Sequence, residues 1–132
     1  MERTHIAAAI ILSPGKSRIF ITQRPNYVHK GGFWEFPGGK VETGESIEQA
    51  VIRELEEETT VQVTEQSRFE AFEYDYCDKL LVFDFVLVTE FRGIPCAKEG
   101  QESRWVRINE LPNFFFPEAN IRVVEKILAN FT

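Results

Sequence analysis

Cysteine and positive charge are both scarce in this sequence, and each scarcity argues against a class of protein. The 132 residues include two cysteines, Cys77 and Cys96, whose wide spacing fits neither a zinc motif nor a disulfide framework. We interpret both as free thiols. The net charge of -6 argues against binding along a nucleic-acid polymer, because such binding requires a basic groove. A small phosphorylated ligand held through metal ions is compatible with this charge.

Long apolar runs are also lacking. None is long enough to span a bilayer, and the apolar stretch 6–12 has neither a basic leader nor a small-residue cleavage site. We therefore expect no membrane association and a cytoplasmic location. The 43% hydrophobic content and the 12 phenylalanines are enough for a real core, so we expect residues 1–132 to form a single domain. We expect this domain to act as a monomer.

The first third of the chain is predicted to be rich in strands. Residues 5–12 and 17–23 have the apolar patterns of two strands joined by a Pro-Gly turn. Residues 25–32 are typical of a loop. Residues 34–36 then form a short extended piece, which we expect the Pro-Gly-Gly run at 37–39 to stop.

A helix is predicted to begin after Ser46. This serine is a good N-cap residue, and Gln49 three positions later completes a capping-box pattern. The helix that follows has an apolar face. The members of that face are Ile47, Ala50, Val51 and Leu55.

Further strands and a final helix are predicted in the second half of the chain. Residues 61–91 are strand-rich, and a short strand at 104–108 follows a polar loop at 98–102. The last helix covers about 118–129, and its expected apolar face consists of Ile121, Val124, Ile127 and Leu128. Helices and strands in mixed order indicate an α/β (α+β) layered domain.

Three carboxylates in the first helix carry the main functional signal. Glu54, Glu57 and Glu58 lie at spacings that put them on one side of a helix, where like charges repel each other. They also lie near the helix C-terminus, where the macrodipole disfavours negative charge. At about 100° per residue, Glu54 and Glu58 fall inside the apolar arc. A divalent cation such as Mg²⁺ or Mn²⁺ would relieve the repulsion, because it prefers hard carboxylate oxygens.

The residues around these glutamates resemble a known motif. Gly39, five residues, Glu45, seven residues, and then the run Arg53-Glu54-Leu55-x-Glu57-Glu58-x-Thr60-Val61 resemble the Nudix box. The family has glycine where this chain has Thr60. The resemblance extends to four further segments, which are similar to the MutT branch of the family in particular. These segments are residues 20–24, 34–39, 98–101 and 116–120.

The resemblance implies a fold and an activity. The fold would be the Nudix α/β/α sandwich, with a mixed β-sheet between helices. The activity would be metal-dependent pyrophosphohydrolysis of a nucleoside triphosphate, with Mg²⁺ as the cofactor and Mn²⁺ as a substitute. The MutT branch removes oxidised guanine nucleotides such as 8-oxo-dGTP, as the monophosphate and pyrophosphate, which prevents mutation.

The resemblance also implies the metal ligands. Glu58 is expected to be the main ligand, together with Glu54 and Glu57. A backbone carbonyl of Gly38 or Gly39 would share the metal.

Other polar residues have expected supporting roles. Arg53 can bridge neighbouring carboxylates such as Glu45 and fix their rotamers, or it can be an ordinary exposed arginine. Glu45 helps to position the loop of the box, or it simply places a favourable charge at a helix N-terminus. By resemblance, Glu99 is a general base or a further metal ligand. Glu102 is the competing residue, and Gly100 favours Glu99 because it permits the loop to close.

Asn120 is the expected reader of the base. Its amide both donates and accepts hydrogen bonds, so it can meet O6 of 8-oxoguanine with its NH₂ and the N7–H with its carbonyl. Unoxidised guanine would leave that carbonyl facing an acceptor, which is costly in a dry pocket. The remaining substrate-binding residues are expected from their positions in the family. They are Arg24, His29, Glu35, Phe36, Pro37, Gly38 and Asp78.

Two alternatives remain open on the sequence. The first is a Nudix hydrolase for another substrate: a cytosine nucleotide, a dinucleoside polyphosphate or a nucleotide sugar. The second is a non-catalytic Nudix-like binding module, although such modules typically lose the metal glutamates.

Thr60 is the departure from the family pattern. The family glycine lies just past the helix, where a left-handed backbone is easiest for glycine. The β-branched Thr60 would accept strain of roughly 1 kcal/mol or more there, or the helix ends differently. We predict that Thr60→Gly raises the melting temperature without loss of chemistry, and an unchanged or lower value would contradict this.

Overall fold

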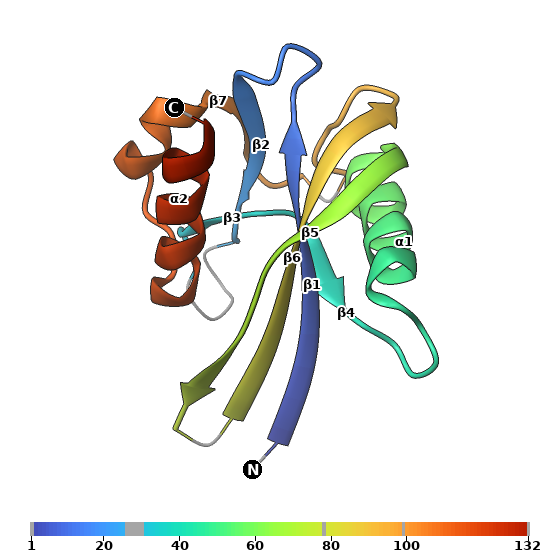
Figure 1. Ribbon diagram of the computed structural model, residues 1–132, viewed down its shortest axis with the longest axis vertical. Helices are drawn as coiled ribbons and strands as arrows, with labels where there is room; N and C mark the ends of the chain where they lie inside the picture. Colours follow the sequence, from blue (N-terminus) through green and yellow to red (C-terminus); the bar gives the residue numbers. More distant parts are fainter. Residues whose placement is uncertain (1, 26–30, 78, 99, 132) are drawn as a thin grey trace.

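A seven-stranded mixed sheet forms the centre of the molecule (Figure 1). The computed structural model describes residues 2–25, 31–77, 79–98 and 100–131. The main path of the sheet has the order β3-β2-β1-β6-β5, with β4 paired to β1 and β7 paired to β2. The strands are β1 (Glu2–Leu12), β2 (Arg18–Gln23), β3 (Trp34–Glu35), β4 (Gly38–Lys40), β5 (Gln62–Tyr76), β6 (Lys79–Arg92) and β7 (Ser103–Arg107). Strands β1 and β6 are parallel, whereas the other pairs are antiparallel.

The two α-helices cover opposite faces of this sheet (Figure 1). Side chains along a strand point alternately to its two faces, and β1 supplies both cores in this way. Ala7, Ala9 and Ile11 pack with the buried face of α1 (Ile47–Thr59). Ala8 and Ile10 pack with the buried face of α2 (Glu118–Phe131). This arrangement confirms the predicted α/β/α sandwich with a mixed sheet between helices.

As predicted, the extended piece ends before the Pro-Gly-Gly run, because β3 stops at Glu35. The run also forms a strand that the sequence did not predict. Gly38, Gly39 and Lys40 form β4, which pairs with β1 opposite Ile6 to Ala8. The two backbones lie so close that a Cβ built on Gly38 would be 2.1 Å from the carbonyl oxygen of Ala7. Glycine is therefore required here for close approach of two strands.

Two further details differ from the sequence prediction. Ile121 was placed on the apolar face of the last helix, but it is 48% exposed. Val124 and Ile127 are buried as predicted, and Leu128 packs against the core. The helix buries Ala119 and Val123 in place of Ile121, so its buried face is shifted from the predicted one. The 3₁₀ helix η1 (Ile108–Asn113) was not predicted, because its Pro112 is a poor sign of any helix interior.

Two smaller sequence predictions can also be compared with the structure. Cys77 and Cys96 are both exposed and free, as predicted. Among the helices that the structure describes, none has the length and apolar character needed to cross a membrane.

Candidate active site

Helix α1 begins where the sequence predicted. The Ser46 side chain accepts a hydrogen bond from the Gln49 backbone N–H at 3.1 Å, and the Gln49 side chain accepts one from the Ser46 N–H at 2.8 Å. The capping box fixes the phase of the helix. As predicted, Glu54 and Glu58 are only partly exposed, whereas Glu57 is exposed.

The end of α1 continues into a strained residue. Thr60 follows the helix with φ 67° and ψ 5°, in the left-handed region. The alternative that the helix ends differently is therefore wrong, and the strain is accepted. The predicted stabilisation by Thr60→Gly stands as a prediction.

The two inward glutamates lie against the glycines of β4. The backbone N–H of Gly38 donates to Glu58 Oε2 at 3.2 Å. A Cβ built on Gly39 would lie 2.5 Å from Cδ of Glu54, so the Glu54 carboxylate fills the place that a side chain at position 39 would need. Two carboxylates and the backbone of β4 therefore converge on one region between α1 and the sheet.

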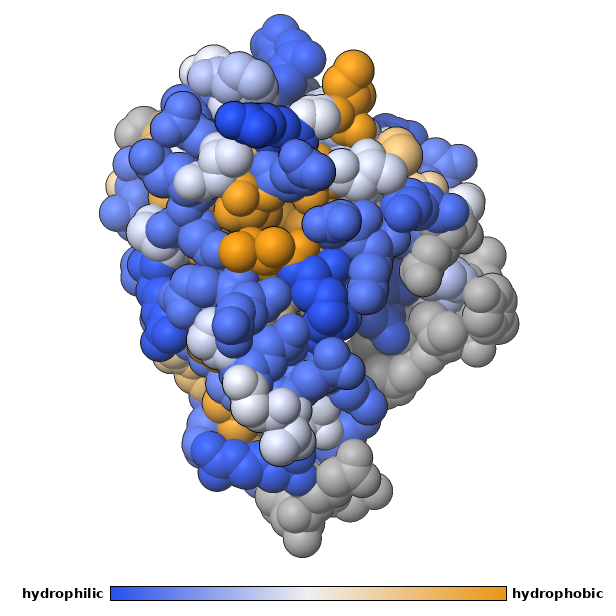
Figure 2. All heavy atoms as spheres, turned by 90° about the vertical axis from the view of Figure 1, so that its right-hand side faces the viewer, coloured by the Kyte–Doolittle hydropathy of each residue, from blue (hydrophilic) through white to orange (hydrophobic). Residues whose placement is uncertain are grey.

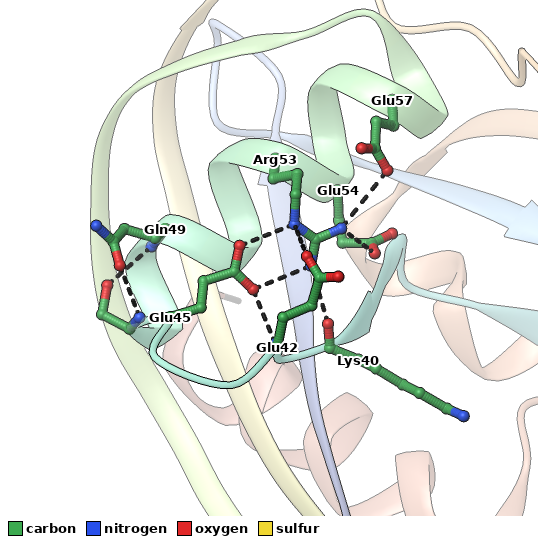
Figure 3. Close-up of polar contacts among 8 residues, drawn as sticks. Lys40, Glu42, Glu45, Gln49, Arg53, Glu54 and Glu57 are labelled. Atoms are coloured by element: carbon green, nitrogen blue, oxygen red, sulfur yellow. Dashed lines mark hydrogen bonds and ion pairs between the residues drawn. The ribbon is translucent and has the colours of Figure 1, made fainter.

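Arg53 is the centre of an ion-pair network on the outer side of that region (Figure 3). Its Nε lies 2.8 Å from Glu45 Oε2, and its NH1 lies 2.8 Å from Glu54 Oε1. It also contacts Glu42 at 3.2 Å and Glu57 at 3.5 Å. A further hydrogen bond from NH2 to the Lys40 carbonyl oxygen measures 3.0 Å and joins the network to β4.

The network stabilises the charged forms of Arg53 and Glu45. Hydrogen bonds to Glu45 and Glu54 raise the pKa of Arg53 above its already high value, so the guanidinium stays charged and cannot act as a proton donor. The hydrogen bond from Arg53 lowers the pKa of Glu45 from 4.5 to about 2. Arg53 is thus placed to hold Glu54 in one rotamer, the bridging role expected from the sequence.

The Arg53–Glu45 pair predicts a pH-dependent stability. Because the pKa of Glu45 is lowered in the folded state, its contribution is complete above pH 4.5 and is lost as the pH falls toward about 2. Glu45→Gln should therefore lower the melting temperature by a few degrees at pH 7, and by progressively less below pH 4.5. Melting curves of both proteins between pH 7 and pH 3 test this. Glu56→Gln, on the exposed side of the same helix, is the matched control and should show no such trend.

The residues present can be tested for their fit to a divalent metal. Across residues 2–25, 31–77, 79–98 and 100–131, no three His, Cys, Asp or Glu side chains are gathered closely enough to hold an ion between them. Glu54, Glu58 and the β4 backbone do supply an oxygen-rich cradle, the donor set that Mg²⁺ and Mn²⁺ prefer. The Glu57 side chain is 64% exposed and pairs with Arg53. The oxygen donors of Glu54, Glu58 and β4 therefore fit a divalent ion, whereas Glu57 lies outside this cradle.

A cavity of about 660 Å³ lies on the α2 face of the sheet. Its lining joins the glycines of β4 to the N-terminus of α2. The predicted site residues that line it are Arg24, Glu35, Phe36, Gly38, Gly39 and Asn120. Since Gly38 and Gly39 also adjoin the two inward glutamates, the cavity meets the carboxylates at β4.

Arg24 and Glu35 form an ion pair in the wall of the cavity, with 2.9 Å between NH1 and Oε1. Burial raises the pKa of Glu35, while the hydrogen bond from Arg24 opposes that rise. The pair fixes the orientation of both side chains. Phe36 is 4% exposed and stacks on Phe116 at 5.2 Å between ring centroids, so it belongs to the core as well as to the cavity wall.

Asn120 is a buried polar residue at the far end of the cavity. It is 9% exposed, and its backbone N–H donates to the Pro117 carbonyl at 2.8 Å. Its side chain lies in the lining of the cavity. An amide in that position can both donate and accept a hydrogen bond, which suits a group that contacts a ligand.

Some predicted residues lie outside these contacts. His29, Asp78 and Glu99 lie outside the described residues. Pro37 is not among the residues that line the cavity; its carbonyl oxygen accepts a hydrogen bond from the Ala9 N–H of β1 at 2.7 Å. Glu42 was missed by the sequence analysis, although its spacing of three residues from Glu45 across a turn that contains Gly44 was a usable signal.

The α1 side of the molecule presents a mainly hydrophilic surface with small apolar areas (Figure 2). This agrees with the outward direction of Glu56 and Glu57, which are both exposed. The carboxylates of α1 are thus divided between a solvated side and the side that faces β4.

The capped acidic helix, the Gly-Gly strand and the adjoining cavity also occur in a chain that matches a known family over nearly its whole length. Residues 3–127 match the NUDIX domain family. The chain therefore belongs to that family, and it is a Nudix hydrolase. Hydrolases of this family generally require a divalent metal ion.

Three individual proteins show which members of the family this chain is similar to. The chain is 41% identical over 127 residues to an 8-oxo-dGTP diphosphatase of Escherichia coli (strain K12), covering 96% of this chain and 98% of that protein. It is 33% identical to a CTP pyrophosphohydrolase of the same organism, covering 98% and 94% of the two chains. A solved structure from a study of MutT from Aliivibrio salmonicida and Vibrio cholerae is 55% identical, with a TM-score of 0.90 and coverage of 98% and 100%.

Proposed function

We propose that this protein hydrolyses oxidised guanine nucleoside triphosphates, 8-oxo-dGTP above all, to the monophosphate and pyrophosphate. Mg²⁺ is the proposed cofactor, and Mn²⁺ can replace it. The enzyme would act as a cytoplasmic monomer on free nucleotides, not on nucleic-acid polymers. Removing the oxidised nucleotide before DNA replication would prevent its misincorporation. The 41% identity to an 8-oxo-dGTP diphosphatase supports this proposal.

The observation that carries the choice of base is the buried amide of Asn120 in the cavity. An 8-oxoguanine edge presents O6 as an acceptor and N7–H as a donor, and one amide can satisfy both. Guanine has an acceptor at N7, which would oppose the amide carbonyl. Because the residue is 9% exposed, water cannot readily repair that mismatch, and the discrimination should be large.

The acidic residues are assigned to the divalent ion that contacts the phosphates. Glu58, Glu54 and Glu57 would hold the divalent ion, with a carbonyl of Gly38 or Gly39. When bound, such an ion stabilises charge on phosphate oxygens and lowers the pKa of bound water. Arg53 orients Glu54, and Glu45 in turn holds Arg53.

The roles of the remaining site residues are proposed from their positions in the sequence relative to the family motif. Glu99 would take the proton of the attacking water as general base or act as a further metal ligand. Arg24 and Glu35 would contact the nucleotide together as a pair, since each fixes the other. His29 and Asp78 would complete the binding of the nucleotide.

Changing Asn120 should test the choice of base. Asn120→Ala removes both hydrogen bonds and should lower kcat/KM for 8-oxo-dGTP by about 10- to 100-fold, with a smaller loss for dGTP. Steady-state kinetics with both nucleotides gives the ratio of the two values. Asn130→Ala, an exposed asparagine of the same helix that bonds the Lys126 carbonyl, is the matched control and should leave the ratio unchanged. An unaltered ratio in Asn120→Ala would remove Asn120 from base recognition.

A cytosine nucleotide is the second candidate, because a CTP pyrophosphohydrolase is 33% identical over 98% of this chain. Cytosine also offers a donor beside an acceptor, so an asparagine amide could pair with it. CTP and dCTP therefore belong in the same kinetic comparison. A higher kcat/KM for either would replace the guanine assignment.

A further inference from the structure

The C-terminal end of α1 is joined to residues 94–98, which lie far from it in the sequence. We call these residues the 94–98 segment. Three hydrogen bonds make the junction, and they use alternate residues of the segment in antiparallel order. They run from Lys98 N to Glu58 O at 3.0 Å, from Cys96 N to Thr59 O at 3.1 Å, and from Thr60 Oγ1 to Ile94 O at 3.2 Å.

This junction satisfies carbonyl groups that a helix end otherwise leaves without partners. The usual solution is local, with N–H groups just past the helix turning back on a left-handed glycine. Here two of the donors come from the 94–98 segment instead. The turn that delivers the segment passes close to the helix end, since a Cβ on Gly93 would lie 3.2 Å from the Thr60 carbonyl oxygen.

Thr60 makes the outermost of the three bonds, and only its side chain takes part in that bond. The residue sits at φ 67°, where glycine would be less strained. Glycine has no hydroxyl and could not hold Ile94. The strain accepted at this position therefore accompanies a contact that the family residue cannot make.

The junction also determines where a positive charge lies near Glu54, Glu57 and Glu58, which we call the acidic site. The Lys98 backbone N–H bonds Glu58 O. The Lys98 side chain lines a hollow of about 470 Å³ together with Arg53 and Glu57. The register of the 94–98 segment therefore sets where the Lys98 cation lies relative to Glu57. A shift of the segment would move a positive charge away from the carboxylate assigned to the metal.

We propose that Thr60 is a positioning residue whose hydroxyl holds the 94–98 segment in register against α1. It acts on catalysis through the placement of Lys98 beside the acidic site. This inference rests on the proposed hydrolase function.

The matched variants are Thr60→Ala and Thr60→Ser, which differ by one oxygen atom at the same strained position. Thr60→Ala should raise the exchange rates of the Cys96 and Lys98 amide hydrogens about tenfold in metal-free protein. It should also lower kcat several-fold with little change in KM. Thr60→Ser should restore both values toward those of the wild type. Hydrogen exchange measured by NMR, and steady-state kinetics with Mg²⁺, provide the readouts.

Thr60→Gly distinguishes an effect on the register of the 94–98 segment from an effect on the stability of the fold. It should melt at a higher temperature because the strain is relieved, yet it should show the faster exchange and lower kcat of Thr60→Ala. This lower kcat replaces the expectation from the sequence that the glycine variant keeps its chemistry. Equal exchange rates in the Ala and Ser variants would overturn the proposal, as would faster exchange with unchanged kcat. A wild-type protein without Mg²⁺-dependent hydrolysis would instead overturn the proposed function, and the exchange rates would then still decide whether the hydroxyl holds the segment.

Discussion

Replacing Glu58 with glutamine is expected to lower kcat/KM for the nucleotide by about 10³-fold, because a charged ligand of the divalent ion is lost. The fold should survive this change. Glutamine keeps the length of the side chain, and its amide oxygen can still accept the hydrogen bond that Gly38 N–H donates to Glu58 at 3.2 Å. The loss should therefore appear in kcat/KM and in metal affinity, with little change in the melting temperature.

The matched control is Glu56→Gln, an exposed carboxylate two residues earlier on the same helix. It changes the net charge by the same amount, so it reports any general electrostatic effect on binding an anionic substrate. We expect its kcat/KM to stay within a factor of about two of the wild type, as surface charge changes are weak. Comparable losses in both variants would show that helix charge in general, and not a ligand at position 58, drives the effect.

Gly39→Ala should abolish most activity while leaving the protein folded. The added Cβ would lie 2.5 Å from Cδ of Glu54 and 2.6 Å from each of its oxygens. A carboxylate at the end of a flexible side chain can move away at low cost, so the conflict should be resolved by displacing Glu54. Displacement takes Glu54 out of the cradle and away from its 2.8 Å contact with Arg53. We expect kcat/KM to fall by about 10²-fold or more.

The neighbouring Gly38→Ala should behave differently, and the contrast tests the explanation. Its Cβ would meet backbone atoms, with the Ala7 carbonyl oxygen at 2.1 Å. A backbone cannot move aside as a side chain can, so this variant should lose the pairing of β4 with β1 and melt at a much lower temperature. Circular dichroism melting curves of the two variants should therefore separate clearly.

A double mutant identifies the cause of the Gly39→Ala defect. If the methyl group acts by displacing Glu54, adding Glu54→Gln to Gly39→Ala should cost little more than either change alone. Additive losses would mean that the two positions act independently and that the steric account is wrong.

Local sequence signals predicted the parts of the site that depend on one helix. The pairing of Ser46 with Gln49 fixed where α1 begins, and the helical period then placed Glu54 and Glu58 inward. Both features are local, because capping and side-chain direction involve residues within a few positions of one another. The resemblance to the Nudix box added the roles but was not needed for the geometry of the helix.

The features that were missed depend on contacts between distant residues. Gly38 and Gly39 were read as a stop, because glycine alone does not show that another strand packs against it at close range. The phase of α2 was set by the sheet beneath it, which exposed Ile121. The bond between Thr60 and Ile94, 34 positions apart, could not be inferred from a sequence in which Thr60 appears only as an unfavourable replacement for glycine.

The most direct test is the rate of phosphoanhydride hydrolysis of 8-oxo-dGTP, dGTP, CTP, dCTP, a dinucleoside tetraphosphate and ADP-ribose, with Mg²⁺ and with a chelator, measured from the separated nucleotide products. We predict that kcat/KM is highest for 8-oxo-dGTP, which yields the monophosphate and pyrophosphate, and that hydrolysis requires the metal. A dominant rate on any other compound would contradict the guanine assignment. No hydrolysis of any of them in the presence of Mg²⁺ would contradict the catalytic role of the acidic site.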